Sequence, residues 1–196
     1  MKMKNKYIET LLKFDSAWKG HGLFAMKLVE TFKPNIIVDL GVDWGFSTFC
    51  FGYPQIGNVY GIDWFQGDDH AGHRDTLNDV DNLYQELIKS FGVSNIEFIK
   101  SDFAEAAKIW DKKIDILHID GFHSYEAVKS DYENWIKFCD EESIILFHDV
   151  ESFPETVGVF FEELVGYKLI HKGSAGLGIL TKSEKNYELI KTFINE

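Results

Sequence analysis

The sequence predicts a single α/β domain in which helices cover both faces of a mostly parallel β-sheet. Short runs rich in β-branched residues alternate with longer segments in which apolar residues recur every three or four positions, the pattern of strands joined by helical crossovers. The 196 residues include only 3 prolines and no Ser/Gly-rich linker, so no internal domain boundary is expected. We expect N-terminal helices within residues 1–34 to pack on a domain formed by residues 35–196.

Seven strands are predicted, and the last two differ from the rest. Only a short segment containing Gly173 and Gly176 separates them, so they are expected to form an antiparallel hairpin. The expected strands are Asn35–Leu40, Asn58–Asp63, Asn95–Lys100, Ile114–Ile119, Ser143–Phe147, Tyr167–His171 and Leu177–Thr181. The predicted fold class is therefore a Rossmann-like sheet with a terminal antiparallel hairpin.

The segments between the strands have helical periodicity. From Ser124 to Cys139 apolar residues recur at spacings of three and four, and Ser124 is a suitable N-cap. The other expected helices are Leu77–Phe91, Phe103–Trp110, Glu155–Val165 and two helices before Pro34. The exception is Trp64–Thr76, which is polar, Gly-rich and too long for a tight turn, and which is therefore a candidate functional loop.

The charge of the chain limits the classes of partner. Lys and Arg total 20 against 32 Asp and Glu, a formal net charge of -12, so neither nucleic acid nor an anionic membrane is an expected partner. The sequence contains no apolar run long enough for a membrane span, and its start lacks the pattern of a signal peptide. Cys50 and Cys139 fit buried thiols in a reducing compartment. We therefore expect a cytoplasmic domain.

Residues that follow the first three strands are suited to a nucleoside, because ligands of open α/β sheets bind beyond the carboxyl ends of the strands. Gly41 and Gly45 allow the backbone to approach a ligand, although a plain strand-to-helix turn explains them equally well. Asp63 can accept hydrogen bonds from both hydroxyls of a ribose, or cap the loop after it. Asp102 and Phe103 can meet the edge and face of an adenine, and Asp102 can equally cap the next helix.

Acids and histidines follow the fourth and fifth strands. Asp120 and Asp149 are expected at adjacent strand ends, where two carboxylates either repel each other or hold a hard cation. His123 and His148 could complete the ligand shell or act as a general base near neutral pH. Three other histidines are expected to be structural: His118 within the core, and His21 and His171 at the surface or in packing.

Four stretches of the sequence resemble motifs of a known enzyme family. They are VDLGVDWGFST at 38–48, VYGIDWFQGDDHAG at 59–72, LHIDGFHSYEAVKSDYENW at 117–135 and IILFHDV at 144–150. These motifs resemble the class I S-adenosylmethionine-dependent methyltransferases, within them the small bacterial group related to sugar and macrolide O-methyltransferases and the cephalosporin-hydroxylase family. The resemblance extends from Asn35 to Thr181. The sequence departs from it at Phe65, where Trp is expected.

The resemblance implies S-adenosylmethionine as the cofactor, with Mg²⁺ or another divalent cation in the metal-dependent relatives. The implied cofactor contacts are Asp39, Gly41, Gly45, Ser47, Asp63, Trp64, Asp102, Phe103 and Asp120. The implied metal ligands are Asp120, His148 and Asp149. The implied catalytic set is Asp120, His123, His148 and Asp149.

The leading hypothesis is O-methylation of a sugar or small-molecule hydroxyl, in which a cation lowers the pKa of the hydroxyl and a neighbouring His or Asp accepts its proton. The alternatives are a metal-dependent hydrolase using the same acids and histidines, and a cofactor-binding module without catalysis. A dehydrogenase is least expected, because the third glycine of its fingerprint is missing. The loop Trp64–Thr76, with His70, His73 and Arg74, is expected to close over the site and select the acceptor. A homo-oligomer is compatible with the sequence.

Overall fold

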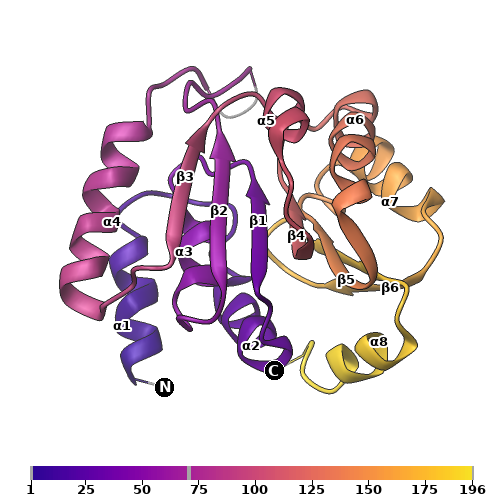
Figure 1. The fold of residues 1–196 in the computed structure, drawn as a ribbon, viewed down its shortest axis with the longest axis horizontal. Coiled ribbons are helices and arrows are strands. Elements are labelled where there is room, and N and C mark those ends of the chain that lie inside the picture. Colours follow the sequence, from indigo (N-terminus) through magenta and orange to yellow (C-terminus); the bar gives the residue numbers. More distant parts are fainter. Residues whose placement is uncertain (1, 70–71, 196) are drawn as a thin grey trace.

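The computed structural model describes residues 2–69 and 72–195, and within them seven strands form one sheet (Figure 1) in the order β3-β2-β1-β4-β5-β7-β6. Strands β1 to β5 are parallel, whereas β7 runs antiparallel to both β5 and β6. The strands are β1 Ile36–Leu40, β2 Asn58–Asp63, β3 Ile96–Lys100, β4 Ile114–Ile119, β5 Cys139–Phe147, β6 Tyr167–His171 and β7 Leu177–Thr181. The predicted fold class is confirmed.

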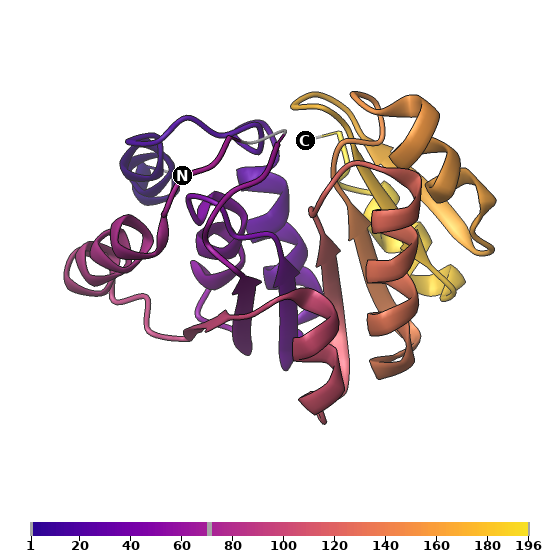
Figure 2. The same cartoon turned by 90° about the horizontal axis from the view of Figure 1, so that it is seen from above.

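Helices cover both faces of this sheet, as Figure 2 shows from above. One face carries α1 Lys2–Leu11, α2 Gly22–Phe32, α3 Phe46–Gly52, α4 Leu77–Phe91 and α8 Glu184–Lys191. The other face carries α5 Phe103–Ile109, α6 Tyr125–Trp135 and α7 Val159–Glu163. Successive strand residues point to opposite faces, so Ile37 joins the first core and Val38 the second.

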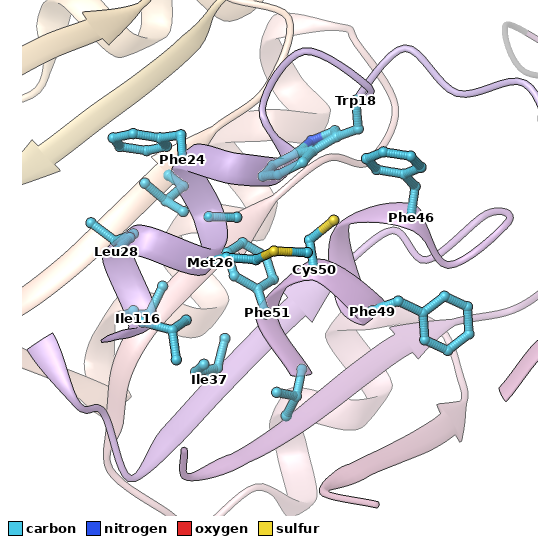
Figure 3. Packing of buried hydrophobic residues seen from close by; sticks show 14 of the residues in the cluster. Trp18, Phe24, Met26, Leu28, Ile37, Phe46, Phe49, Cys50, Phe51 and Ile116 are labelled. Atoms are coloured by element: carbon cyan, nitrogen blue, oxygen red, sulfur yellow. The ribbon is translucent and has the colours of Figure 1, made fainter. Parts of the chain in front are cut away.

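The first core is rich in aromatic side chains. Figure 3 shows Trp18, Phe24 and Met26 gathered over Phe51 of α3, with Ile37 of the sheet beneath them. The N-terminal segment takes part in this packing, because the fully buried Tyr7 donates a hydrogen bond from its hydroxyl to the Phe49 carbonyl at 2.9 Å. The N-terminal helices therefore bury apolar surface together with the rest of the domain.

The structure corrects two predicted boundaries and adds one helix. Helix α6 ends at Trp135 and a 3₁₀ turn, η1 Ile136–Phe138, follows. Cys139 belongs to β5 rather than to a helix, because it pairs with Ile114 of β4. The segment predicted as one helix over 155–165 is a π-helical turn, η2 Pro154–Gly158, followed by the short α7. Helix α8 was not predicted, although Ser183 caps it by accepting a hydrogen bond from the Asn186 backbone.

The parallel strands place their carboxyl ends at one edge of the sheet, and backbone hydrogen bonds extend the pairing into the loops there. The Asp120 N–H donates to the Leu40 carbonyl at 2.8 Å, and the His148 N–H donates to the Ile119 carbonyl at 3.2 Å. This pairing fixes the residues that follow β1, β4 and β5 relative to one another. No helix of the described residues is long and apolar enough to cross a membrane.

Tyr7→Ala should lower the free energy of unfolding by about 4 kcal/mol, because it removes a buried aromatic ring. Tyr7→Phe should cost only about 1 kcal/mol, since it removes one hydrogen bond and keeps the ring. Urea denaturation followed by circular dichroism measures both. Met3→Ala is the control, because Met3 lies on the same helix and is 57% exposed, and should change stability by less than about 0.5 kcal/mol. A neutral Tyr7→Ala would contradict the packing of α1 on the domain.

Candidate active site

A cavity of about 700 Å³ lies beyond the carboxyl ends of the parallel strands. This volume is within the range of small-molecule sites. The loops after β1, β2, β3, β4 and β5 all line the cavity. The loop after β2 is the predicted functional loop, and it contributes Trp64, Gly67, Asp68, Arg74 and Thr76. The N-terminal residues Ser16–Trp18 and part of α6 also line the cavity. The predicted loop residue His70 lies outside the described residues.

The loop after β1 brings backbone close to the cavity. Gly41 has a φ of +97°, and a Cβ there would lie 2.0 Å from the Asp120 carbonyl oxygen, so only glycine fits. Asp43 also has a positive φ, 45°. Gly45, with a φ of +85°, turns the chain into α3 and does not line the cavity. Gly41 is therefore the glycine of this loop that a ligand would meet.

Asp63, at the end of β2, holds the backbone of the loop after β1 in place through hydrogen bonds. Its Oδ2 accepts hydrogen bonds from the Val42 and Asp43 backbone N–H groups at 2.8 and 2.9 Å. Its Oδ1 accepts from the Phe65 N–H at 2.7 Å. Asp63 also lines the cavity, and a carboxylate has about four acceptor positions. The predicted loop-capping role is therefore present, and acceptor capacity for ribose hydroxyls remains.

The loop after β3 supplies Asp102 and Phe103, and both line the cavity. Asp102 caps α5, because its Oδ1 accepts from the backbone N–H groups of Ala104 and Glu105 at 2.8 and 3.2 Å. Helix α6 contributes Ser130 and Asp131 to the lining, and the loop after β4 contributes the partly exposed Phe122. This end of the cavity therefore combines two aromatic rings with two carboxyl groups.

The four predicted acids and histidines lie together at the ends of β4 and β5. The His148 Nδ1 lies 2.9 Å from Asp149 Oδ2 and 3.3 Å from Asp120 Oδ1. The His123 Nε2 lies 2.9 Å from Asp149 Oδ2 and 3.9 Å from Asp120 Oδ1. Asp149 has a φ of +64°, a strained conformation for a residue other than glycine. The backbone is held in this conformation where the carboxylate meets both imidazoles.

Opposite charges set the protonation of this cluster. Burial alone would lower the pKa of His148, but the Asp120 carboxylate, helped by Asp149, raises it to about 10. Burial likewise opposes charge on His123, yet hydrogen bonds to Asp120 and Asp149 raise its pKa to about 9. Burial would raise the pKa of both carboxyls, but the two imidazoles hold each below its usual range. The cluster therefore has balanced charges.

The two histidines of the cluster differ in accessibility. The His148 side chain is 1% exposed, and its Nε2 donates to the Ser174 carbonyl oxygen at 2.8 Å, so both ring nitrogens are occupied. The His123 side chain is 18% exposed, and its ring stacks on Phe153 with centroids 4.3 Å apart. His123 is therefore the histidine that can meet a ligand, whereas His148 positions the carboxylates.

A metal ion could be held by Asp120, His123 and Asp149, which each offer one ligand atom within 4.8 Å of the others. Two carboxylate oxygens and one imidazole suit a hard divalent cation such as Mg²⁺ or Mn²⁺. His148, the third ligand expected from the resemblance, faces the same two carboxylates through Nδ1. The residues present therefore fit a metal ion.

Most of the predicted contacts line the cavity, and two do not. Those that line it are Gly41, Ser47, Asp63, Trp64, Asp102, Phe103, Asp120, His123, His148 and Asp149. Gly45 turns the chain into α3 and does not line the cavity. Asp39 is fully buried, and its carboxylate accepts a hydrogen bond from the Ser47 hydroxyl at 2.7 Å and pairs with His118. Asp39 therefore supports the cavity wall from the core, and His118 is the core histidine that was expected.

Several lining residues were not predicted as site residues. They are Ser16, Ala17, Trp18, Trp44, Phe122, Asp131 and Phe153. Trp18 reaches the cavity from before the first strand, and no local pattern of the sequence indicates this position. Asp131 lies within a predicted helix, and the spacing of the apolar residues there does not indicate which polar residue borders the cavity. The burial of His21 also depends on the tertiary structure, since its Nε2 shares the Ser174 carbonyl with His148 and its Nδ1 meets His171 at 2.7 Å.

Comparisons with known proteins identify relatives of this chain. A family model described as a methyltransferase domain matches residues 38–150. An uncharacterized protein of Sinorhizobium fredii, y4gI, is 35% identical over 178 residues, covering 84% of this chain. The chain spans only 19% of the length of that relative.

Two solved structures share the fold of this chain. The methyltransferase PaMTH1 of Podospora anserina, bound to S-adenosylhomocysteine, is 12% identical with a TM-score of 0.64, over 91% of this chain and 87% of that one. The TDP-rhamnose 3′-O-methyltransferase CalS11, an enzyme of calicheamicin biosynthesis, is 16% identical with a TM-score of 0.62, over 83% and 78%.

His21 should make the protein less stable in acid. Burial, together with the neighbouring histidines, lowers its pKa from 6.5 to about 3, so the unfolded state binds one more proton between these values. Its contribution is present above pH 6.5 and is lost as the pH falls. On lowering the pH from about 7.5 to about 5, the wild type should lose about 2 kcal/mol more unfolding free energy than His21→Gln. Denaturant titrations at several pH values measure this difference, and parallel losses would refute it.

Proposed function

The chain belongs to the methyltransferase-domain family, and on that premise we propose that it transfers the methyl group of S-adenosylmethionine to a hydroxyl of a sugar or another small molecule. The observation that carries the proposal is the cluster of Asp120, His123, His148 and Asp149 at one end of a cavity of about 700 Å³. The rest of the cavity has the groups that an adenosine needs. The proposal thus assigns the cofactor and the acceptor to one cavity.

The described residues fit the cofactor. Only glycine fits position 41, where a Cβ would lie 2.0 Å from the Asp120 carbonyl oxygen, and such a site lets a ligand approach the backbone. Asp63 has acceptor capacity for ribose hydroxyls, and Phe103 and Phe122 offer faces for a base. When bound, S-adenosylmethionine supplies a sulfonium methyl group for an in-line displacement. The structure of PaMTH1 with S-adenosylhomocysteine supports this ligand class.

The acid and histidine cluster prepares the acceptor. An alcohol is a weak nucleophile near neutral pH, so its proton must be accepted while the oxygen attacks. All four members of the cluster line the cavity. His123 is the more exposed histidine, whereas both ring nitrogens of His148 are occupied by Asp149 and the Ser174 carbonyl, so His148 holds the carboxylates in place. In the absence of a cation both imidazoles hold a proton, so His123 becomes a proton acceptor only when another positive charge compensates the carboxylates.

A divalent cation held by Asp120 and Asp149 would supply this charge and lower the pKa of the acceptor hydroxyl, and the His123 ring could then accept the proton. His148 would hold the two carboxylates while it keeps its contact with the Ser174 carbonyl. The division of roles between the histidines follows from their exposure: His123 accepts the proton and His148 positions the acids.

The acceptor side of the cavity favours a ring-shaped molecule. Trp18, Trp44 and Trp64 all line the cavity, and aromatic faces pack against sugar rings and flat apolar molecules. Arg74 lies over the Trp44 ring at 5.1 Å and pairs with Asp43 at 2.6 Å, linking the predicted functional loop to the loop after β1. The sugar acceptor of CalS11 supports the sugar class, and the wide cavity accommodates it.

Family membership does not favour the alternative of a metal-dependent hydrolase. A hydrolase would also leave Asp63 and the loop after β1 without a role. A measurement of turnover distinguishes the proposed enzyme from a binding module without catalysis. The two cysteines are free thiols, which supports the predicted reducing, cytoplasmic compartment. The net charge of -12 supports a neutral or cationic acceptor over nucleic acid. A homo-oligomer stays a prediction.

Calorimetric titration with S-adenosylhomocysteine, with and without Mg²⁺, tests the proposed cofactor and metal. We expect binding with a Kd of about micromolar order and a change in affinity or heat when Mg²⁺ is present. Methyl transfer to a panel of sugar and phenolic hydroxyls, including TDP-rhamnose, is then followed by mass spectrometry. Absence of S-adenosylhomocysteine binding under both conditions would overturn the proposed function.

Asp149→Asn should reduce turnover by about 100-fold or more while S-adenosylhomocysteine affinity changes less than about threefold. Asparagine tolerates the positive φ at this position, so the variant removes the charge without straining the backbone. Asp111→Asn is the matched control, because the Asp111 side chain is 84% exposed and lies outside the cavity lining. Equal loss of turnover and cofactor affinity, or loss of neither, would contradict the role given to Asp149.

A further inference from the structure

The cavity contains a carboxyl group that the proposed reaction does not use. Asp131 projects from α6 and lines the cavity together with Ser130 and Ala127 of the same helix. A Cβ added at Gly121 would lie 2.8 Å from Asp131 Oδ2 and 2.8 Å from Phe103 Cε2. The carboxyl group and the aromatic ring therefore flank the same glycine, at the end of the cavity next to β3.

The protein supplies few hydrogen-bonding or charged groups next to the Asp131 carboxyl group. Among residues 2–69 and 72–195, no hydrogen-bond donor contacts its carboxyl group. The charged group that acts on it from a neighbouring element is Asp102, at the start of α5. Burial, together with the Asp102 carboxylate, raises the pKa of Asp131 to about 7. Asp131 is half-buried, so partial desolvation of a carboxyl group without a protein partner costs free energy, and a ligand that supplies a hydrogen-bond partner offsets this cost.

We propose that Asp131 recognises the edge of the adenine base of the cofactor by accepting a hydrogen bond from the N6 amino group. This inference rests on the proposed function, because it takes an adenosine as the ligand. The resemblance assigned adenine to Asp102, but Asp102 Oδ1 already accepts two backbone hydrogen bonds as the cap of α5. Neither oxygen of Asp131 is engaged by a hydrogen bond from the described residues, and the carboxyl group lies beside the Phe103 ring at Gly121.

The chemistry of the two groups is complementary. Adenine presents a donor at N6 beside an acceptor at N1, and a protonated carboxyl group presents an acceptor beside a donor. The neutral acid can therefore form two hydrogen bonds with the base, whereas the carboxylate forms only the bond from N6 and opposes the lone pair of N1. Asparagine presents the same donor and acceptor at every pH. Unsubstituted purine keeps N1 but lacks the amino group, so it loses the hydrogen bond from N6 to the Asp131 oxygen.

Calorimetric titration with S-adenosylhomocysteine and with its purine analogue, which lacks only the N6 amino group, separates base recognition from general binding. We expect the wild type to prefer the adenine compound by about tenfold or more. Asp131→Ala should lose about tenfold in S-adenosylhomocysteine affinity and most of this preference. Asp131→Asn should stay within about threefold of the wild type. From about pH 6 to about pH 8.5 the affinity of the wild type should fall, and that of Asp131→Asn should not. Glu133→Ala is the control, because Glu133 is an exposed acid of the same helix that lies outside the cavity lining.

Two outcomes would overturn the role of Asp131. The first is an Asp131→Ala variant that binds S-adenosylhomocysteine like the wild type. The second is an equal loss of both compounds, which indicates packing rather than recognition. If Asp131→Ala fails to fold by circular dichroism, Asp131→Ser replaces it, with the same expectations. A wild type that binds neither compound refutes the proposed function itself, whereas a wild type that binds while Asp131→Ala binds equally refutes only the inference about this residue.

Discussion

The site depends on holding two carboxylates together at the ends of adjacent parallel strands. Asp120 and Asp149 have like charges, and the imidazoles of His148 and His123 offset the repulsion between them. His148 can do this only in one orientation, which the Ser174 carbonyl selects by accepting from Nε2. The same carbonyl accepts from His21, and the Ser174 hydroxyl accepts from the Gly20 backbone. The loop between β6 and β7 thereby anchors the acid cluster and the N-terminal segment that forms part of the cavity wall.

This arrangement explains why some of the site could be predicted from the sequence. Parallel strands bring their carboxyl ends to one edge, so strand boundaries alone place Asp63, Asp102, Asp120 and Asp149 near each other. Periodicity was sufficient for the strands and most helices, and the expected cap at Ser124 is formed. The errors at Cys139 and in residues 155–165 arise where strand pairing and a π-helical turn override local periodicity. Residues such as Trp18 and Ser174 could not be predicted, because their positions depend on contacts between distant parts of the chain.

The structure also separates residues that line the cavity from residues that support its wall. Asp39 lies within β1, and Gly41 and Gly45 follow that strand in the next loop. Asp39 nevertheless binds Ser47 and His118 in the core, and Gly45 turns the chain into α3. A residue close to a motif in the sequence therefore lies near the site, but this closeness does not predict whether its side chain lines the cavity. The same distinction applies to His148 and His123, which differ in exposure although both meet the same carboxylates.

Arg74 couples the two halves of the cavity. Arg74 comes from the loop after β2, donates to the Asp43 carboxylate and lies over the Trp44 ring. This one side chain therefore joins the loop after β2 to the loop after β1. The Asp43 backbone is in turn fixed by Asp63, the residue assigned to the ribose. Asp63, Asp43 and Arg74 therefore form one chain of contacts from the end of β2, through the loop after β1, to the loop that was predicted to select the acceptor.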